Sequence, residues 1–182
     1  ARSRGYNCLL FEGPGQGRAI REQGLRFRPD WQVVAAPVVN FARERMEVDG
    51  DRIALWGEEF GGHLVARALA FERRPRAGVV NGGVYDLHAV VVRKPELERL
   101  LDDPAASRMV DLELYRRMKG DPALRRIFGN GMFAFGAKSP GEWMRLTRSY
   151  TLKSVAGVIA TPMLVCDSEE DRDTAGQSGK LY

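Results

Sequence analysis

One short stretch, residues 53–63 (IALWGEEFGGH), constrains the fold more than any other part of the chain. It begins as an apolar β-strand, turns sharply at its glycines and continues as a helix rich in alanine and leucine. Glu59 stands at the centre of the turn, with Gly57 and Gly61 two residues to either side. A strained backbone at the centre would make side chains at the flanking positions collide with neighbouring elements, so we expect glycine to be required at both.

Apolar runs and turn signals divide the rest of the chain in a regular order. Buried strands are predicted over residues 5–11, 52–56, 77–80 and 161–166. Helices are predicted over residues 31–46, which include Pro37, and over 63–71. The stretch 85–156 has the pattern of amphipathic helices separated by Asp-Pro, Gly-Asn-Gly and Ser-Pro-Gly turns. Strands that alternate with helices predict an α/β fold, in which a parallel sheet carries helices on both faces.

Length and composition exclude several classes of protein. The 182 residues carry a net charge of +4, and no basic face with interleaved aromatic residues indicates a nucleic-acid partner. No apolar run approaches the ~20 residues of a membrane span, and the start lacks the apolar region of a signal peptide. Cys8 and Cys166 each lie in an apolar run, so we expect two buried free thiols, a reducing compartment and a cytoplasmic location. No spacing of residues indicates a metal site or a cofactor.

Four motifs occur in an order that resembles the α/β-hydrolase superfamily. They are the loop Glu12-Gly-Pro-Gly-Gln-Gly17, the turn Gly57-x-Glu59-x-Gly61-Gly62, the segment Leu164-Val-Cys-Asp-Ser-Glu-Glu-Asp171 and the later Gly176-Gln177. The chain is similar in particular to the bacterial and fungal hydrolases that include dihydroxypseudooxynicotine hydrolase and the polyketide-shortening pigment enzymes. The resemblance implies a first part of the hydrolase core in residues 1–83, a helical lid in residues 84–157, and the acid strand and loop in residues 158–182.

The same resemblance implies roles for three residues of the site. Glu59 takes the place of the usual serine nucleophile, Asp171 that of the acid which orients a histidine, and the backbone N–H of Phe60 that of an oxyanion donor. The sequence departs from the family pattern at Glu59 and in having no histidine after the acid loop. We expect that histidine beyond Tyr182 and the oxyanion loop before the first strand. The chain, which begins without Met, is therefore predicted to be an incomplete portion of the full core.

Glu59 allows three interpretations. Its carboxylate is ionised at neutral pH without help, so it could be a covalent nucleophile, although it suits displacement at saturated carbon better than attack on a carbonyl. It could be a general base, which requires only reach and a suitable pKa. It could also have lost its catalytic role, because a helix N-terminus tolerates a carboxylate. Asp171 is either the catalytic acid or part of a solvated acidic loop, with Asp167 as its rival.

The two histidines and the helical region complete the candidate site. His63 lies on the same helix face as Glu59 and either partners it or packs beneath neighbouring elements, and His88 either faces the pocket or has a structural role. Met and aromatic side chains are frequent in residues 84–157, and such side chains suit a bulky apolar ligand. We therefore expect a hydrolase that cleaves esters or carbon-carbon bonds in a bulky apolar carbonyl compound. The alternative is an inactive relative that binds a small molecule or a partner protein, and homo-oligomer formation is left open.

Overall fold

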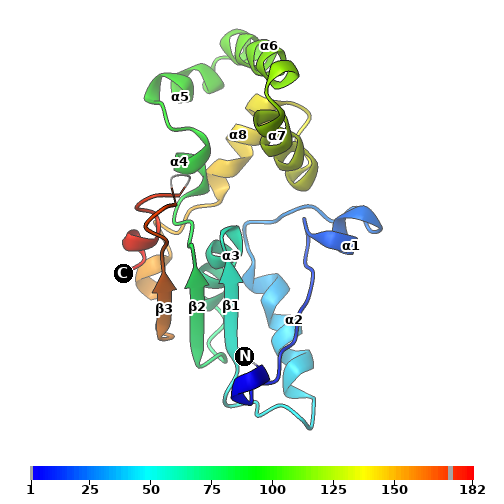
Figure 1. The fold of residues 1–182 in the computed structure, drawn as a ribbon, viewed down its shortest axis with the longest axis vertical. Coiled ribbons are helices and arrows are strands. Elements are labelled where there is room, and N and C mark those ends of the chain that lie inside the picture. Colours follow the sequence, from blue (N-terminus) through cyan, green and yellow to red (C-terminus); the bar gives the residue numbers. More distant parts are fainter. Residues whose placement is uncertain (1, 172–173) are drawn as a thin grey trace. The chain divides into compact units, whose positions relative to one another are not determined.

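The computed structural model describes residues 2–171 and 174–182, which form two compact units. The sheet unit consists of residues 2–12, Pro29–Tyr85 and Leu152–Tyr182, and the helical unit of Gly13–Arg28 and Asp86–Thr151 (Figure 1). The helical unit thus includes residues 13–28, which the sequence analysis placed with the first part of the core. Among the described residues no helix is long and apolar enough to cross a membrane.

A parallel sheet of three strands lies at the centre of the sheet unit. The strands β1 (Ala54–Glu58), β2 (Ala77–Asn81) and β3 (Met163–Cys166) lie side by side in that order (Figure 1). Trp56 of β1 is in register with Val79 of β2, which in turn is in register with Leu164 of β3. The predicted parallel sheet is confirmed, with three of the four predicted strands.

The prediction of a buried strand over residues 5–11 is wrong. After the short 3₁₀ helix η1 (Arg2–Arg4), these residues pair with no described strand, and every one of them is exposed. Leu10, for example, is 93% exposed, and Cys8 is exposed as well, so its predicted burial is also wrong. The run is apolar enough for a strand, but it pairs with neither edge strand of the sheet, β1 or β3, and no described layer covers it.

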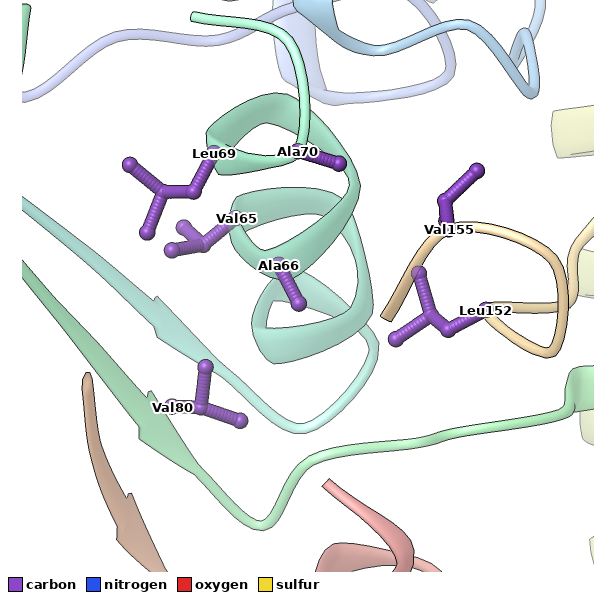
Figure 2. Close-up of a cluster of buried hydrophobic side chains, with 7 residues drawn as sticks. All are labelled: Val65, Ala66, Leu69, Ala70, Val80, Leu152 and Val155. Atoms are coloured by element: carbon purple, nitrogen blue, oxygen red, sulfur yellow. The ribbon is translucent and has the colours of Figure 1, made fainter. Parts of the chain in front are cut away.

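Helix α3 (Phe60–Leu69) packs on one face of the sheet and forms the core of this unit. Its small side chains let the helix approach β2 closely, and Gly78 leaves the space that the Leu69 side chain fills. Figure 2 shows the cluster that results; its buried members are Val65, Ala66, Leu69, Ala70, Val80, Leu152 and Val155. Leu152 and Val155 come from the segment that precedes the 3₁₀ helix η3 (Ala156–Val158).

The opposite face of the sheet carries no helix among the described residues. Trp56 is 62% exposed and Leu164 is 60% exposed on that face. Helix α2 (Gln32–Arg43) contacts α3 rather than the strands, and it ends three residues before the predicted end at Met46. The expected helices on both faces are therefore found on one face within residues 2–171 and 174–182.

The helical unit contains one short α-helix within residues 13–28 and five α-helices within residues 86–151. These are α1 (Gly17–Arg21), α4 (Leu87–Val91), α5 (Pro95–Asp102), α6 (Pro104–Gly120), α7 (Pro122–Phe135) and α8 (Pro140–Leu146). The predicted Asp-Pro and Ser-Pro turns are N-caps: Asp103 accepts a hydrogen bond from Ala106 N at 2.7 Å, and Asp121 accepts one from Leu124 N at 2.9 Å.

The core of the helical unit explains why residues 13–28 belong to it. Six buried residues form that core: Val92, Leu101, Met118, Phe128, Trp143 and Met144. The Phe27 ring lies 5.1 Å from that of Phe135, which packs against this core, and Phe27 N donates to Ala134 O at 2.9 Å. The Met and aromatic side chains that indicated an apolar ligand thus include residues that bury the helices against each other.

Candidate active site

The candidate residues of the sheet unit follow the carboxyl ends of its three strands. Glu59 comes directly after β1, the turn Asn81-Gly82-Gly83 ends β2, and the acidic loop with Asp171 follows β3. Because the strands are parallel, their carboxyl ends share one edge of the sheet, where ligands bind in open α/β sheets. Gly82 N donates to Cys166 O at 2.9 Å, which joins the ends of β2 and β3.

The backbone of Glu59 is strained. Its φ is 51° and its ψ is −119°, and among the described residues it is the one non-glycine with a positive φ. It is the N-cap of α3, and its N–H donates to Asn81 O at 2.8 Å. The side chain is exposed, and no described residue forms a hydrogen bond or an ion pair with it. The turn therefore presents, at the N-terminus of a helix, a carboxylate that has no partner within residues 2–171 and 174–182.

Two glycines make this turn possible, and they are not the predicted pair. A Cβ at Gly57 would overlap the carbonyl group of Gly61. A Cβ at Gly62 would lie 2.8 Å from Val80 Cγ1 and 3.1 Å from Gly83 Cα, whereas a Cβ at Gly61 would meet nothing within 4 Å. The steric requirement thus holds at Gly57 and Gly62, because helix α3 packs against the sheet with Gly62 facing β2 and Gly61 facing away.

Phe60 and His63 occupy the first turn of α3. Phe60 is the first residue of the helix, so its N–H belongs to the group that no residue within the helix can bind. Its ring stacks on the His63 imidazole with centroids 5.3 Å apart and planes inclined by 14°. His63 is 1% exposed, and its Nδ1 lies 2.9 Å from Val84 O, so Nδ1 carries a proton that is donated to this carbonyl.

Asp171 is held in one orientation by a residue three positions further on. Thr174 donates to it twice, from its N–H to Oδ1 at 3.1 Å and from its hydroxyl to Oδ2. Its rival Asp167 is exposed and accepts only a local bond, from Ser168 N at 3.0 Å, among the bonds described for it. Of the two carboxylates, Asp171 is the more rigidly positioned.

His88 lies in the helical unit, within a network of charged and polar groups. Its Nδ1 is 2.9 Å from Met144 O and 2.8 Å from Thr147 Oγ1, and its Nε2 contacts Glu98. Arg148 pairs with Glu98 at 2.6 Å from the other side. Burial acts to raise the pKa of Glu98, but the hydrogen bond and charge of His88 and the charge of Arg148 outweigh it and lower that pKa. These contacts give His88 a place in the packing of the helices.

The described residues contain no group of three or more His, Cys, Asp or Glu that could hold a metal ion. Cys8 and Cys166 are both free thiols, and Cys166 at the end of β3 is half-buried. The residues that anchor the turn after β2, above all Ser178, escaped the sequence analysis, because bonds between a side chain and a distant backbone carbonyl leave no local pattern.

Comparisons with known proteins identify the fold to which this geometry belongs. The chain is 36% identical to hydrolase acrC of Aspergillus aculeatus, over 81% of its own length and 36% of acrC. It is 40% identical to the alpha/beta hydrolase psoB of Aspergillus fumigatus, over 98% of its own length and 43% of psoB. The crystal structure of 2,6-dihydroxy-pseudo-oxynicotine hydrolase superposes with a TM-score of 0.56 at 20% identity, covering 84% of this chain and 34% of that one. The chain has the α/β-hydrolase fold.

The resemblance deduced from the four motifs is thereby confirmed, since the similar proteins carry hydrolase names and the solved structure shares the fold. No family model matches the chain. The chain spans less than half the length of each of these three proteins, so it corresponds to a portion of the α/β-hydrolase core.

Proposed function

We propose that the protein acts as a hydrolase on a bulky apolar carbonyl compound, cleaving an ester or a carbon-carbon bond, with Glu59 as its reacting carboxylate. The observation that carries this proposal is the backbone of Glu59, with φ 51° and ψ −119° between a strand and a helix. Residues with a strained backbone cluster at active sites, where the strain fixes a side chain in position. This is the geometry of a nucleophile elbow, with glutamate where serine is usual.

In this proposal Glu59 is the general base. A carboxylate is a weak nucleophile toward a carbonyl carbon, and the anhydride that it would form is readily reversed. As a base, Glu59 takes a proton from water while the water oxygen attacks the carbonyl carbon, and it returns that proton to the leaving group. The Phe60 N–H, at the N-terminus of α3, is the proposed donor to the oxyanion that develops. Asp171 is the proposed second acidic group of the site.

A pair of neighbouring substitutions tests the role of Glu59. Glu58 is exposed at the end of β1, and like Glu59 it has no described partner, so Glu58→Gln is a matched control for Glu59→Gln. With a panel of aryl esters and β-diketones as substrates, Glu59→Gln should lower kcat/KM by a factor of about 10²–10⁴ and Glu58→Gln should leave it unchanged. Equal activity in both variants would refute the proposal.

Isotope labelling separates the two catalytic roles. Attack of Glu59 on a carbonyl carbon would form a mixed anhydride. When the reaction is run in H₂¹⁸O, hydrolysis of that anhydride at the glutamate carbonyl leaves ¹⁸O in Glu59, whereas a general base incorporates no label. Finding ¹⁸O by mass spectrometry in the peptide that contains Glu59 would therefore refute the general-base role, and Glu59→Ser tests whether a serine at this position gives esterase activity.

A non-catalytic binding role is the second candidate, and one observation favours it. Both histidines of the chain are engaged in packing, His63 with Val84 O and His88 with Met144 O and Glu98. A protein of this kind would bind an apolar small molecule with the same affinity in the wild type and in Glu59→Gln, and it would show no turnover. A lid role for residues 84–157, a cytoplasmic location and a homo-oligomeric state stay predictions.

A further inference from the structure

Residues 81–84, which are the last residue of β2 and the three that follow it, each form a hydrogen bond with a distant residue of the sheet unit. Every one of them uses a backbone group for a hydrogen bond that spans at least 21 positions of sequence. The bonds are Glu59 N to Asn81 O at 2.8 Å, Gly82 N to Cys166 O at 2.9 Å, Ser178 Oγ to Gly83 O at 3.2 Å, and His63 Nδ1 to Val84 O at 2.9 Å. We call residues 81–84 the anchored turn.

The anchored turn lies directly against the strained residue. A Cβ added at Gly82 would lie 3.8 Å from both the Cα and the N of Glu59, and Gly82 itself has a φ of 70°. A Cβ at Gly83 would overlap Val80 Cγ1 and lie 3.2 Å from Leu181 Cδ1. The space around Gly83 is filled, and Asn81 O binds Glu59 N directly, so a shift of the turn displaces the backbone of Glu59.

Two buried side chains hold the turn in place. Ser178, in the 3₁₀ helix η4 (Ser178–Lys180), is 2% exposed, and His63 is 1% exposed. Ser178 belongs to the segment that follows the acidic loop, and His63 belongs to the helix that follows Glu59. His63 also stacks on Phe60, so one imidazole contacts the residue after Glu59 and the end of the anchored turn.

We infer that Ser178 and His63 are positioning residues, which fix the strained backbone of Glu59 through the anchored turn. In their absence the carbonyls of Gly83 and Val84 lose their donors inside the protein, where an unpaired carbonyl is costly. The turn then moves toward other donors, and the Glu59 N–H loses its fixed acceptor. This inference rests on the proposed function in one respect only, which is that Glu59 is the reacting group whose position matters.

Amide hydrogen exchange of the full chain, measured without substrate, tests the inference. Ser178→Ala should accelerate exchange of the Glu59 and Gly82 amides about tenfold, which is the effect of losing one buried hydrogen bond. The Ala70 amide, which donates to Ala66 O at the far end of α3, should exchange as in the wild type. Ser154→Ala, the same change at an exposed position of the sheet unit, is the control.

A second pair of variants covers the case in which Ser178→Ala folds poorly. His63→Asn keeps a donor nitrogen near the position of Nδ1, and His63→Leu removes it. We expect faster exchange at Glu59 and Gly82 in His63→Leu and restored protection in His63→Asn. Unchanged exchange at these amides, or uniform acceleration that includes Ala70, would overturn the inference.

The outcome is separate from that of the proposed function. If the chain hydrolyses esters, Ser178→Ala should lower kcat with little change in KM, because the reacting group is misplaced while the binding surface is retained. If Glu59→Gln leaves the activity unchanged, or the wild type shows none, the proposed function fails, and the exchange experiment still decides whether Ser178 and His63 hold the turn.

Discussion

The neighbouring glycines at the start of α3 give a sharp test of the packing described above, because the same substitution should have opposite effects at the two positions. Gly61→Ala adds a methyl group where nothing lies within 4 Å. Gly62→Ala adds one 2.8 Å from Val80 Cγ1 and 3.1 Å from Gly83 Cα. Both positions are helical, and neither has a positive φ, so backbone strain does not separate them.

The magnitudes follow from two opposing terms. Alanine is favoured over glycine within a helix by up to about 1 kcal/mol, which should raise the stability of Gly61→Ala by roughly half that amount in the first turn. Gly62→Ala gains the same term but overpacks a core in which Val80 is fully buried, at a cost of about 1–3 kcal/mol. We expect a net loss of about 1–2 kcal/mol for Gly62→Ala.

Urea unfolding followed by far-UV circular dichroism measures both effects. For a chain of this length, a loss of 1–2 kcal/mol corresponds to a melting temperature lower by roughly 2–8 °C. The two variants should keep the wild-type m-value, so that the midpoints report stability. Equal destabilisation by Gly61→Ala and Gly62→Ala would show that α3 does not pack with Gly62 facing β2, and the steric explanation of the turn would then be wrong.

Three further predictions concern ion pairs. Glu72 is buried and bound by Arg74 at 2.6 Å, and the hydrogen bond from Arg74 lowers the pKa of that carboxyl. Arg74→Ala should therefore lower the free energy of unfolding by about 2 kcal/mol at pH 7. Measured by urea unfolding, this difference from the wild type should shrink as the pH falls below about 4, where Glu72 is protonated and the wild type loses the stabilisation. A difference that stays constant with pH would contradict this. The pKa of Glu98 is likewise lowered in the folded protein, so its carboxylate stabilises the fold at pH values above the unfolded pKa of about 4.3. In His88→Phe, ¹³C NMR should show that the pKa of Glu98 rises, and an unchanged pKa would refute the contact. Hydrogen bonds from two arginines of its own helix lower the pKa of Glu113, so its carboxyl signal should titrate below the ~4.3 of a free glutamate, but because the groups are exposed the shift and its contribution are small, and Glu113→Gln should lower the urea midpoint at pH 7 only slightly; a large loss would contradict this.

Periodicity and turn chemistry were sufficient to predict most of the fold. Ala77–Asn81 is apolar and ends in Asn-Gly-Gly, and the structure has β2 there. The Asp-Pro pairs at Asp103 and Asp121 were predicted to separate helices, and each begins one, because aspartate caps a helix and proline suits its first position; the predicted Gly-Asn-Gly turn at residues 129–131 is wrong, since α7 continues through it. These signals are local, and each residue carries its own preference wherever the rest of the chain lies.

The errors occurred where a residue's environment depends on distant segments. Residues 5–11 have the apolar character of a strand, yet a strand forms only where it pairs with another, and this run pairs with neither β1 nor β3, the edge strands of the sheet. Gly61 and Gly62 are equivalent in sequence, and only the direction in which the helix meets Val80 decides which of them must lack a side chain. Ser178 has no motif of its own, because its partner Gly83 O lies 95 positions away.

The site shows the same division between local and distant causes. The sequence marks Glu59 through the glycines around it, but it does not show that Glu59 N binds Asn81 O at the end of β2, nor that α3 and η4 bind the residues that follow Asn81. A residue with φ 51° and ψ −119° costs of order 1–3 kcal/mol, and such a conformation persists only when the surroundings determine it in several independent ways. The anchored turn does so through Asn81 O, which binds Glu59 N, and through Ser178 and His63, which hold the next carbonyls. The strain at Glu59 is thus sustained by its bond to Asn81 and by the buried bonds that hold the anchored turn, while its carboxylate stays exposed and unpartnered among the described residues; this arrangement fixes the position of a reacting group and leaves it accessible to a substrate.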